Sequence, residues 1–184
     1  MVWAWGLNQY GQCGVSRSRS NYYNNHTIPV PTIVQGLPMH DIIQVSAGEH
    51  HSTAVTEDGE LMVWGRHDSG QLGLGQALPK AVSGDLEGSP DYLQTPVVVP
   101  GIGVSFIGCG TYHNIAISRE GHAYSWGFGG VYQTGLGPSG AEKVESPTRI
   151  VNTATEGVRM VFADGGGQFS VLAGIPQKHT DGTL

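Results

Sequence analysis

One acid and two adjacent histidines, Glu49, His50 and His51, form the polar group of this sequence that is best suited to chemistry. Such a group could serve as a proton-transfer dyad, as metal ligands or as a contact on another protein, and its structural alternative is a solvated turn. Neighbouring residues of a strand point to opposite faces, so the two imidazoles are poorly placed to bind one ion. We therefore predict no metal site and no cofactor here.

Short strands flank this group and must position it. An apolar stretch at residues 45–47 leads into Gly48, and an alternating stretch at 52–55 follows the histidines. A turn at Asp58-Gly59 then precedes a strand at 60–65, because glycine reaches the positive φ that tight hairpins require. The acid and the first histidine are therefore expected on a turn between two strands.

The two histidines are predicted to have different roles. His113 recurs at the position equivalent to His51, so we predict that His51 is buried and hydrogen-bonded to the backbone. His50 has no histidine at its equivalent position, which leaves it as the candidate for contact with a partner, with Glu49 orienting or charging its imidazole. The weaker candidates are Tyr112 and Gln168, which lie in the equivalent turns further along the chain.

A repeat of about 60 residues organises the whole chain. Trp5-Gly6, Trp64-Gly65 and Trp126-Gly127 are spaced 59 and 62 residues apart, and the turn glycines Gly48, Gly110 and Gly166 are spaced 62 and 56 apart. A glycine pair and a proline before a β-branched run recur between these landmarks. The repeated tryptophans are best explained by packing between neighbouring sheets. The positions assigned to this structural repeat are Gly48, His51, Trp64, Gly110, His113, Trp126 and Gly166.

Each repeat contains about four short strands, and no window predicts an amphipathic helix. The 29 glycines and the 13% of charged residues suit many strands joined by tight turns. We therefore predict an all-β fold, a partial β-propeller. The predicted units are a partial blade at 1–34, blades at 42–99 and 104–151, a partial blade at 158–174 and a C-terminal tail at 175–184. Three to four blade equivalents leave open edges, so we expect a fragment of a longer protein that associates through those edges.

Composition and motifs exclude several functional classes. The net charge of −6 disfavours binding of the whole chain to nucleic acid or an anionic membrane, and no segment has 18 consecutive apolar residues. Cys13 and Cys109 occupy positions that favour small residues, which predicts buried free thiols and a reducing compartment. The glycine-rich run 135–140 lacks the strand and helix of a nucleotide fingerprint. The sequence has no hydrolase motif, so we predict no covalent chemistry and no small-molecule ligand.

These landmarks resemble the regulator of chromosome condensation family, which includes the nucleotide exchange factor for the small GTPase Ran. The family's general pattern is present as Gly48, His51, Asp58-Gly59, Trp64-Gly65 and Gln71-Leu72-Gly73. More specific runs, at 2–8, 48–52, 123–128 and 166–172, are similar to the fungal Ran exchange factors. The resemblance implies three to four of the seven four-stranded blades of such a propeller, from its C-terminal part.

The resemblance further implies a guanine nucleotide exchange factor that binds its GTPase and destabilises the nucleotide-bound state. The family's functional histidine in this blade falls on His50, on the face toward the GTPase, whereas Phe169 stands where some relatives have another functional histidine. The wedge loop, the functional aspartates and the chromatin-binding arm belong to regions absent from this chain. We therefore expect no efficient exchange by the chain alone.

The resemblance also implies a nuclear location, with the cytoplasm as the alternative, and partners that comprise a Ran-type GTPase and, through the absent regions, chromatin. No membrane partner is expected. A second functional class remains open, a propeller that serves as a general scaffold for protein interactions. The two classes differ in the role of His50 and of the face around it.

Overall fold

The computed structural model describes residues 1–15, 26–39, 41–78 and 92–177, and in these residues regular structure is almost entirely β. A two-stranded sheet comes first, with β1 (Trp3–Leu7) and β2 (Thr27–Ile33). A four-stranded sheet follows, with β3 (Ile42–Ala47), β4 (His51–Thr56), β5 (Leu61–Arg66) and β6 (Tyr92–Val98). The next four-stranded sheet contains β7 (Val104–Cys109), β8 (His113–Ser118), β9 (Ala123–Phe128) and β10 (Lys143–Arg149). The last sheet pairs β11 (Val158–Gly165) with β12 (Ser170–Pro176), and one 3-10 turn spans Gly75–Ala77.

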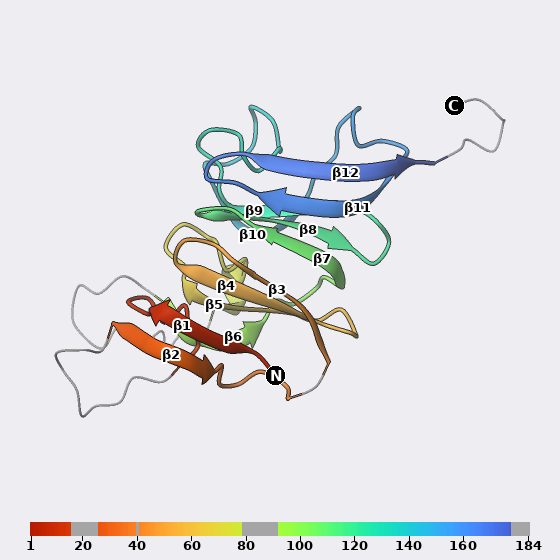
Figure 1. The fold of residues 1–184 in the computed structure, drawn as a ribbon. Helices are drawn as coiled ribbons and strands as arrows, with labels where there is room; N and C mark the ends of the chain where they lie inside the picture. The colour runs from red at the N-terminus through yellow and green to blue at the C-terminus, as the bar shows by residue number, and fades with distance from the viewer. Residues whose placement is uncertain (16–25, 40, 79–91, 178–184) are drawn as a thin grey trace.

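All strand pairs are antiparallel, and each four-stranded sheet is a simple meander. Figure 1 shows the sheets stacked in chain order, with the two-stranded sheets at opposite ends of the stack. The first strand of each four-stranded sheet approaches the next sheet, since β3 contacts β7 and β7 contacts β11. These are blades of a partial propeller, which confirms the predicted fold class. β12 continues to Pro176, two residues beyond the last blade as predicted from the sequence.

Trp64 and Trp126 are buried between neighbouring sheets, at 2% and 0% exposure. Trp126 belongs to the main apolar cluster, together with Val63 and Leu72 of the preceding blade. Trp5, at the same position of the first sheet, is 61% exposed. The prediction of packing between sheets is therefore wrong for Trp5, because no described sheet lies in front of it.

One main-chain carbonyl organises each interface between blades. The Gln71 carbonyl accepts a hydrogen bond from the Asn114 amide (2.7 Å) and one from the Trp126 indole (3.1 Å), both in the next blade. The side chain of Gln71 accepts a bond from the Ser69 N–H, which fixes the loop that presents this carbonyl. The preceding interface repeats the arrangement, with the Gln12 carbonyl accepting from Ser52 (2.8 Å) and Trp64 (2.8 Å).

The buried histidines extend this network. His51 Nε2 lies 2.9 Å from Asn114 Oδ1. Because the Asn114 amide nitrogen already donates to Gln71, its oxygen must accept, so the His51 ring carries its proton on Nε2. His113 repeats the contact with Ser170 Oγ at 2.8 Å. The bonding partners are therefore side chains of the next blade, and the predicted backbone bond of His51 is absent from its ring nitrogens.

Each of these histidine rings lies against the glycine that opens its turn. A Cβ added at Gly110 would stand 2.1 Å from His113 Cε1 and 2.6 Å from the Gly166 carbonyl of the next blade. Gly48 is equally confined, by His51 and by the Gly110 carbonyl. The backbone angles at these two glycines do not require glycine. Glycine is required here by space alone, because the histidine ring and the neighbouring blade both approach the α-carbon of the glycine.

We expect Gly110→Ala to lower the free energy of unfolding by about 2 kcal/mol or more, since the methyl group overlaps a buried ring and a main-chain oxygen. The measurement is urea unfolding of the 184-residue chain. Gly167→Ala is the matched control, because its Cβ would meet only Thr111 Oγ1, at 3.8 Å. Equal stability of the two variants would contradict the steric argument.

Stability should also depend on pH. Burial lowers the pKa of His51 to about 4 from an ordinary value of 6.5, and burial also lowers the pKa of His113. Below pH 6.5 the unfolded chain therefore binds more protons than the folded chain. The contribution of His51 is complete above pH 6.5 and is lost as the pH falls toward 4. We expect urea unfolding to show lower stability at pH 5 than at pH 7.5, with a smaller difference in His51→Gln.

Candidate protein-docking site

The turn between β3 and β4 carries Glu49 and His50 at one rim of the stack. Backbone bonds hold the turn in place: Gly48 N–H donates to the His51 carbonyl (2.9 Å), and Arg66 N–H donates to the His50 carbonyl (2.9 Å). The Glu49 N–H also donates to the Thr111 carbonyl of the next blade (3.4 Å). The turn is thus tied to the end of its own blade and to the equivalent turn of its neighbour.

The His50 side chain lies within a group of polar and aromatic residues. Its Nε2 is 3.5 Å from Glu49 Oε1. Its ring centroid lies 4.5 Å from that of Tyr10 and 6.4 Å from that of Tyr112. His50 is mostly buried, whereas the Glu49 carboxylate is about half exposed. The ring is therefore held by its neighbours while the acid reaches the surface.

Arg66 adds a cation to this group. Its guanidinium binds Asp68 through two nitrogens, Nε and Nη2, and lies 4.9 Å from the Tyr10 ring centroid and 5.7 Å from that of Tyr112. The hydrogen bond to Asp68 raises the pKa of Arg66. Burial opposes ionisation of Asp68. The hydrogen bond from Arg66 and the positive charge of Arg66 outweigh the effect of burial, so the pKa of the Asp68 carboxyl is lowered. Both groups are therefore charged at neutral pH.

Tyr112 connects the two charged pairs. Its pKa is raised, first by burial and then by a hydrogen bond with Glu49. The phenol therefore stays protonated at neutral pH and donates to the Glu49 carboxylate. The docking surface, defined here as Tyr10, Glu49, His50, Arg66, Asp68 and Tyr112, presents acidic, cationic and aromatic groups together. Such a combination favours binding of a protein surface.

The structure brings together three of the four candidates for partner contact, namely Glu49, His50 and Tyr112. Gln168 occupies the equivalent turn of the last sheet, where Gly166 N–H donates to the Phe169 carbonyl, and lines a different groove with Phe169 and Ser170. That the two adjacent histidines bind no metal ion remains a prediction. Among the described residues, no group of three histidine, cysteine or acidic side chains is arranged to hold an ion.

Sequence reasoning missed Tyr10, Arg66 and Asp68. The position of Arg66 could have been found, because the pairing of His51 with Gly65 places the next residue of β5 beside His50. Asp68 follows two residues later in the same loop. Tyr10 comes from the loop after β1, and its place beside His50 depends on how the first sheet stacks on the second. No pattern within one repeat contains that information.

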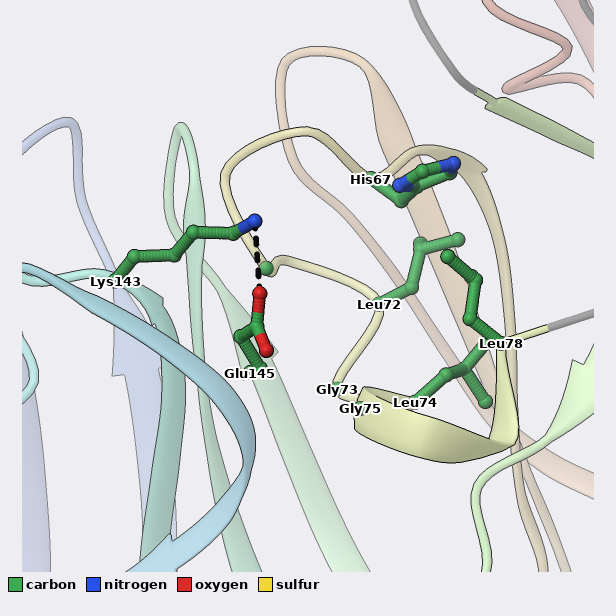
Figure 2. A pocket seen from close by; sticks show the side chains of 9 residues that line it. His67, Leu72, Gly73, Leu74, Gly75, Leu78, Lys143 and Glu145 are labelled. Carbon is green, nitrogen blue, oxygen red and sulfur yellow. Dashed lines mark ion pairs between the residues drawn. The ribbon is translucent and has the colours of Figure 1, made fainter. Parts of the chain in front are cut away.

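A second hollow lies nearby, between the loop that follows β5 and strand β10 of the next blade. Figure 2 shows Leu72, Leu74 and Leu78 on one wall, with the ion pair of Lys143 and Glu145 (2.9 Å) on the other side. The hollow does not include the Glu49–His50 turn. We therefore treat it as a feature of the interface between blades.

The two cysteines are free and buried, as predicted. Burial raises the pKa of Cys109 to about 11 and also raises that of Cys13. Both thiols are therefore protonated and unreactive at neutral pH. The described part of the chain contains no helix that is long and apolar enough to span a membrane.

Repeated four-stranded blades that stack through buried tryptophans and histidines define a propeller repeat protein. The model of the regulator of chromosome condensation (RCC1) repeat matches residues 1–55, 58–117 and 120–173, so the chain belongs to this family. This confirms the resemblance drawn from the sequence.

Individual relatives agree with this assignment. The chain is 40% identical to Protein RCC1 of Candida albicans over 95% of its own length and 38% of that protein. It is 36% identical to the guanine nucleotide exchange factor SRM1 of Saccharomyces cerevisiae, over 97% of the chain and 36% of that protein. The crystal structure of Prp20p from Saccharomyces cerevisiae is described together with its binding to Gsp1p and histones. It matches this chain with a TM-score of 0.86 at 36% sequence identity, and the match covers 98% of this chain and 41% of that one. The chain thus spans less than half the length of these relatives.

Proposed function

We propose that this chain forms part of the GTPase-binding surface of a guanine nucleotide exchange factor for a small GTPase of the Ran type. The observation that carries the proposal is the docking surface, in which His50 is fixed on a rim between Glu49, Tyr10 and Tyr112. The similarity to exchange factors along nearly the whole chain supports it. His50 and Glu49 are the primary contact residues, and Tyr112 is a further one.

The geometry suits recognition of a partner by a prearranged surface. Arg66 is already bound to Asp68 and stacked beside two tyrosines, so little side-chain freedom is lost when a partner docks. An exchange factor acts by binding the nucleotide-free GTPase more tightly than the nucleotide-bound form. The chain performs no covalent step in this proposal. Its residues supply part of that difference in affinity.

The remaining parts of the proposal concern the cellular setting. The Prp20p structure is described with histone binding, and a second structure of the yeast protein is described in complex with Kap60. By similarity we place this chain in the nucleus, near chromatin. The alternative of a general scaffold would give binding that does not depend on the nucleotide state of a GTPase.

The test is binding of the 184-residue chain to Ran in its nucleotide-free and GDP-bound states, measured by biolayer interferometry. We expect preferential binding to the nucleotide-free form and at least about tenfold weaker binding by His50→Ala, because a central contact residue is removed. The chain covers only part of its relatives, so we expect little acceleration of nucleotide release by the chain alone.

His122→Ala provides the matched control, since His122 lies by the turn between β8 and β9, on the rim opposite His50. Its binding should equal that of the unmodified chain. If the chain bound both nucleotide states equally, or if His50→Ala had no effect, the proposed exchange role of the docking surface would be wrong.

A further inference from the structure

The turn that carries Glu49 is repeated in the next blade without its charge. Gly48 and Gly110 open these two turns, and each N–H donates across its own turn to the carbonyl of the buried histidine, at 2.9 and 2.8 Å. Thr111 stands at the place of Glu49 in the second turn, and Gly167 stands there in the last sheet. The turn therefore forms without an acid at this position, so the fold does not require Glu49.

The ion pair beside this turn is likewise confined to one blade. Arg66 binds Asp68, whereas the equivalent residues after β9 are Phe128 and Gly130. Arg66 and Phe128 nevertheless make the same main-chain hydrogen bond to the turn of their own blade, at 2.9 and 2.8 Å. The charged side chains are therefore additions to a backbone that forms without them. Their concentration at one place on the rim indicates a role in recognition.

The positive charge of Arg66 is already matched within the docking surface. Its guanidinium binds the Asp68 carboxylate through Nε and Nη2, with the Nε–Oδ1 bond at 2.9 Å. The ring centroids of Tyr10 and Tyr112 lie 4.9 and 5.7 Å from the guanidinium carbon, and the side chain is only 23% exposed. A bidentate carboxylate and aromatic faces are the contacts that a guanidinium prefers. Arg66 thus serves to hold the surface together.

The negative charge of Glu49, in contrast, has no lysine or arginine beside it. None of the described lysines and arginines forms an ion pair with Glu49. Its neighbours are the His50 ring, with Nε2 at 3.5 Å from Oε1, and the Tyr112 phenol, which donates a hydrogen bond to it. The side chain is 48% exposed, so an incoming group can reach the carboxylate.

A second acid adds to the negative charge around Glu49. Burial first, then the hydrogen bond with Glu49, and then the charges of Glu49 and Asp68 raise the pKa of Tyr112, so both acids lie near its phenol. The docking surface contains these two acidic residues, and Arg66 is its only basic one apart from the histidine. It therefore carries one excess negative charge, and that charge resides on the exposed side chain of Glu49.

We propose that Glu49 selects the partner by binding a lysine or arginine side chain of the docked protein, an inference that rests on the proposed GTPase-binding role. The ammonium or guanidinium group binds the carboxylate that Tyr112 and His50 hold in place. The excess negative charge attracts such a group and steers its approach. A partner with an acidic group at the matching position is rejected, because like charges repel each other.

The first test compares Glu49→Gln with the unmodified 184-residue chain in binding to nucleotide-free Ran, by biolayer interferometry at low and high salt (about 50 and 300 mM NaCl). Glutamine keeps an oxygen that accepts from Tyr112, so the variant removes the charge and retains the hydrogen bond. We expect about tenfold weaker binding and slower association at low salt. The difference should shrink at high salt, because salt screens exposed charges.

Glu60→Gln is the matched control. It removes the same charge from an exposed residue that follows β4, whereas Glu49 precedes β4, so the two lie at opposite ends of one strand. Its binding should equal that of the unmodified chain at both salt concentrations. Circular dichroism of Glu49→Gln checks that the chain stays folded, as the uncharged turn at Thr111 leads us to expect.

Equal binding by Glu49→Gln and the unmodified chain would overturn the inference. Tighter binding would also overturn it and would assign recognition to Arg66, since the loss of Glu49 then relieves the repulsion of an acidic group. A loss of binding that does not change with salt would instead indicate neutral N–H donors of the partner. The GTPase-binding role is judged separately, by His50→Ala and by the preference for nucleotide-free Ran. If the chain bound Ran in neither nucleotide state, both proposals would be wrong.

The second test identifies the cation of the partner by exchange of charge. Each exposed lysine and arginine of Ran is changed singly to glutamate and is measured against the unmodified chain and against Glu49→Lys. We expect one position at which the glutamate weakens binding of the unmodified chain and strengthens binding of Glu49→Lys, by at least about fivefold each, because the pair is then inverted. A complete panel without such a position would contradict the proposal.

Discussion

A main-chain carbonyl in the loop after each Trp-Gly pair holds one blade of this protein to the next. The Gln71 carbonyl accepts from Asn114 and Trp126, and Asn114 in turn accepts from His51. Loop, tryptophan, turn and buried histidine are thus parts of one hydrogen-bonded unit. The packing of the sheets and the position of the rim both depend on it, because each unit sets the distance and orientation between two successive blades.

This constraint separates two neighbouring residues that have the same side chain. His51 points into the interface, where burial keeps it neutral and Asn114 fixes its ring. His50, one residue earlier, leaves the interface and lies on the rim with Tyr10 and Glu49. The bonds that hold His51 in the interface thereby also fix the place of His50 on the rim. Arg66 reaches the same place because its N–H is bonded to the His50 carbonyl.

The repeat landmarks were sufficient to predict the strands, the tight turns and the different environments of His50 and His51, because these depend on spacing within about 60 residues. They were insufficient wherever two blades meet. The bond from His51 to Asn114 joins residues 63 apart, and its existence depends on the stacking of separate sheets. Tyr10 was missed for the same reason. Trp5 was predicted to be buried by analogy with Trp64, although burial depends on the sheet in front, which a local pattern does not contain.

The acceptor at the centre of each interface belongs to the backbone, and this has a consequence for how the repeats can change over evolutionary time. No amino-acid substitution can delete a carbonyl, so the essential half of each contact is protected from mutation. One of the two donors varies, and within this single chain it is Ser52, Asn114 and Ser170 in turn, whereas the other is a tryptophan indole in both complete contacts. Blades built on such an asymmetric contact can diverge in sequence while they keep their relative geometry. Their rims are then able to acquire different partners.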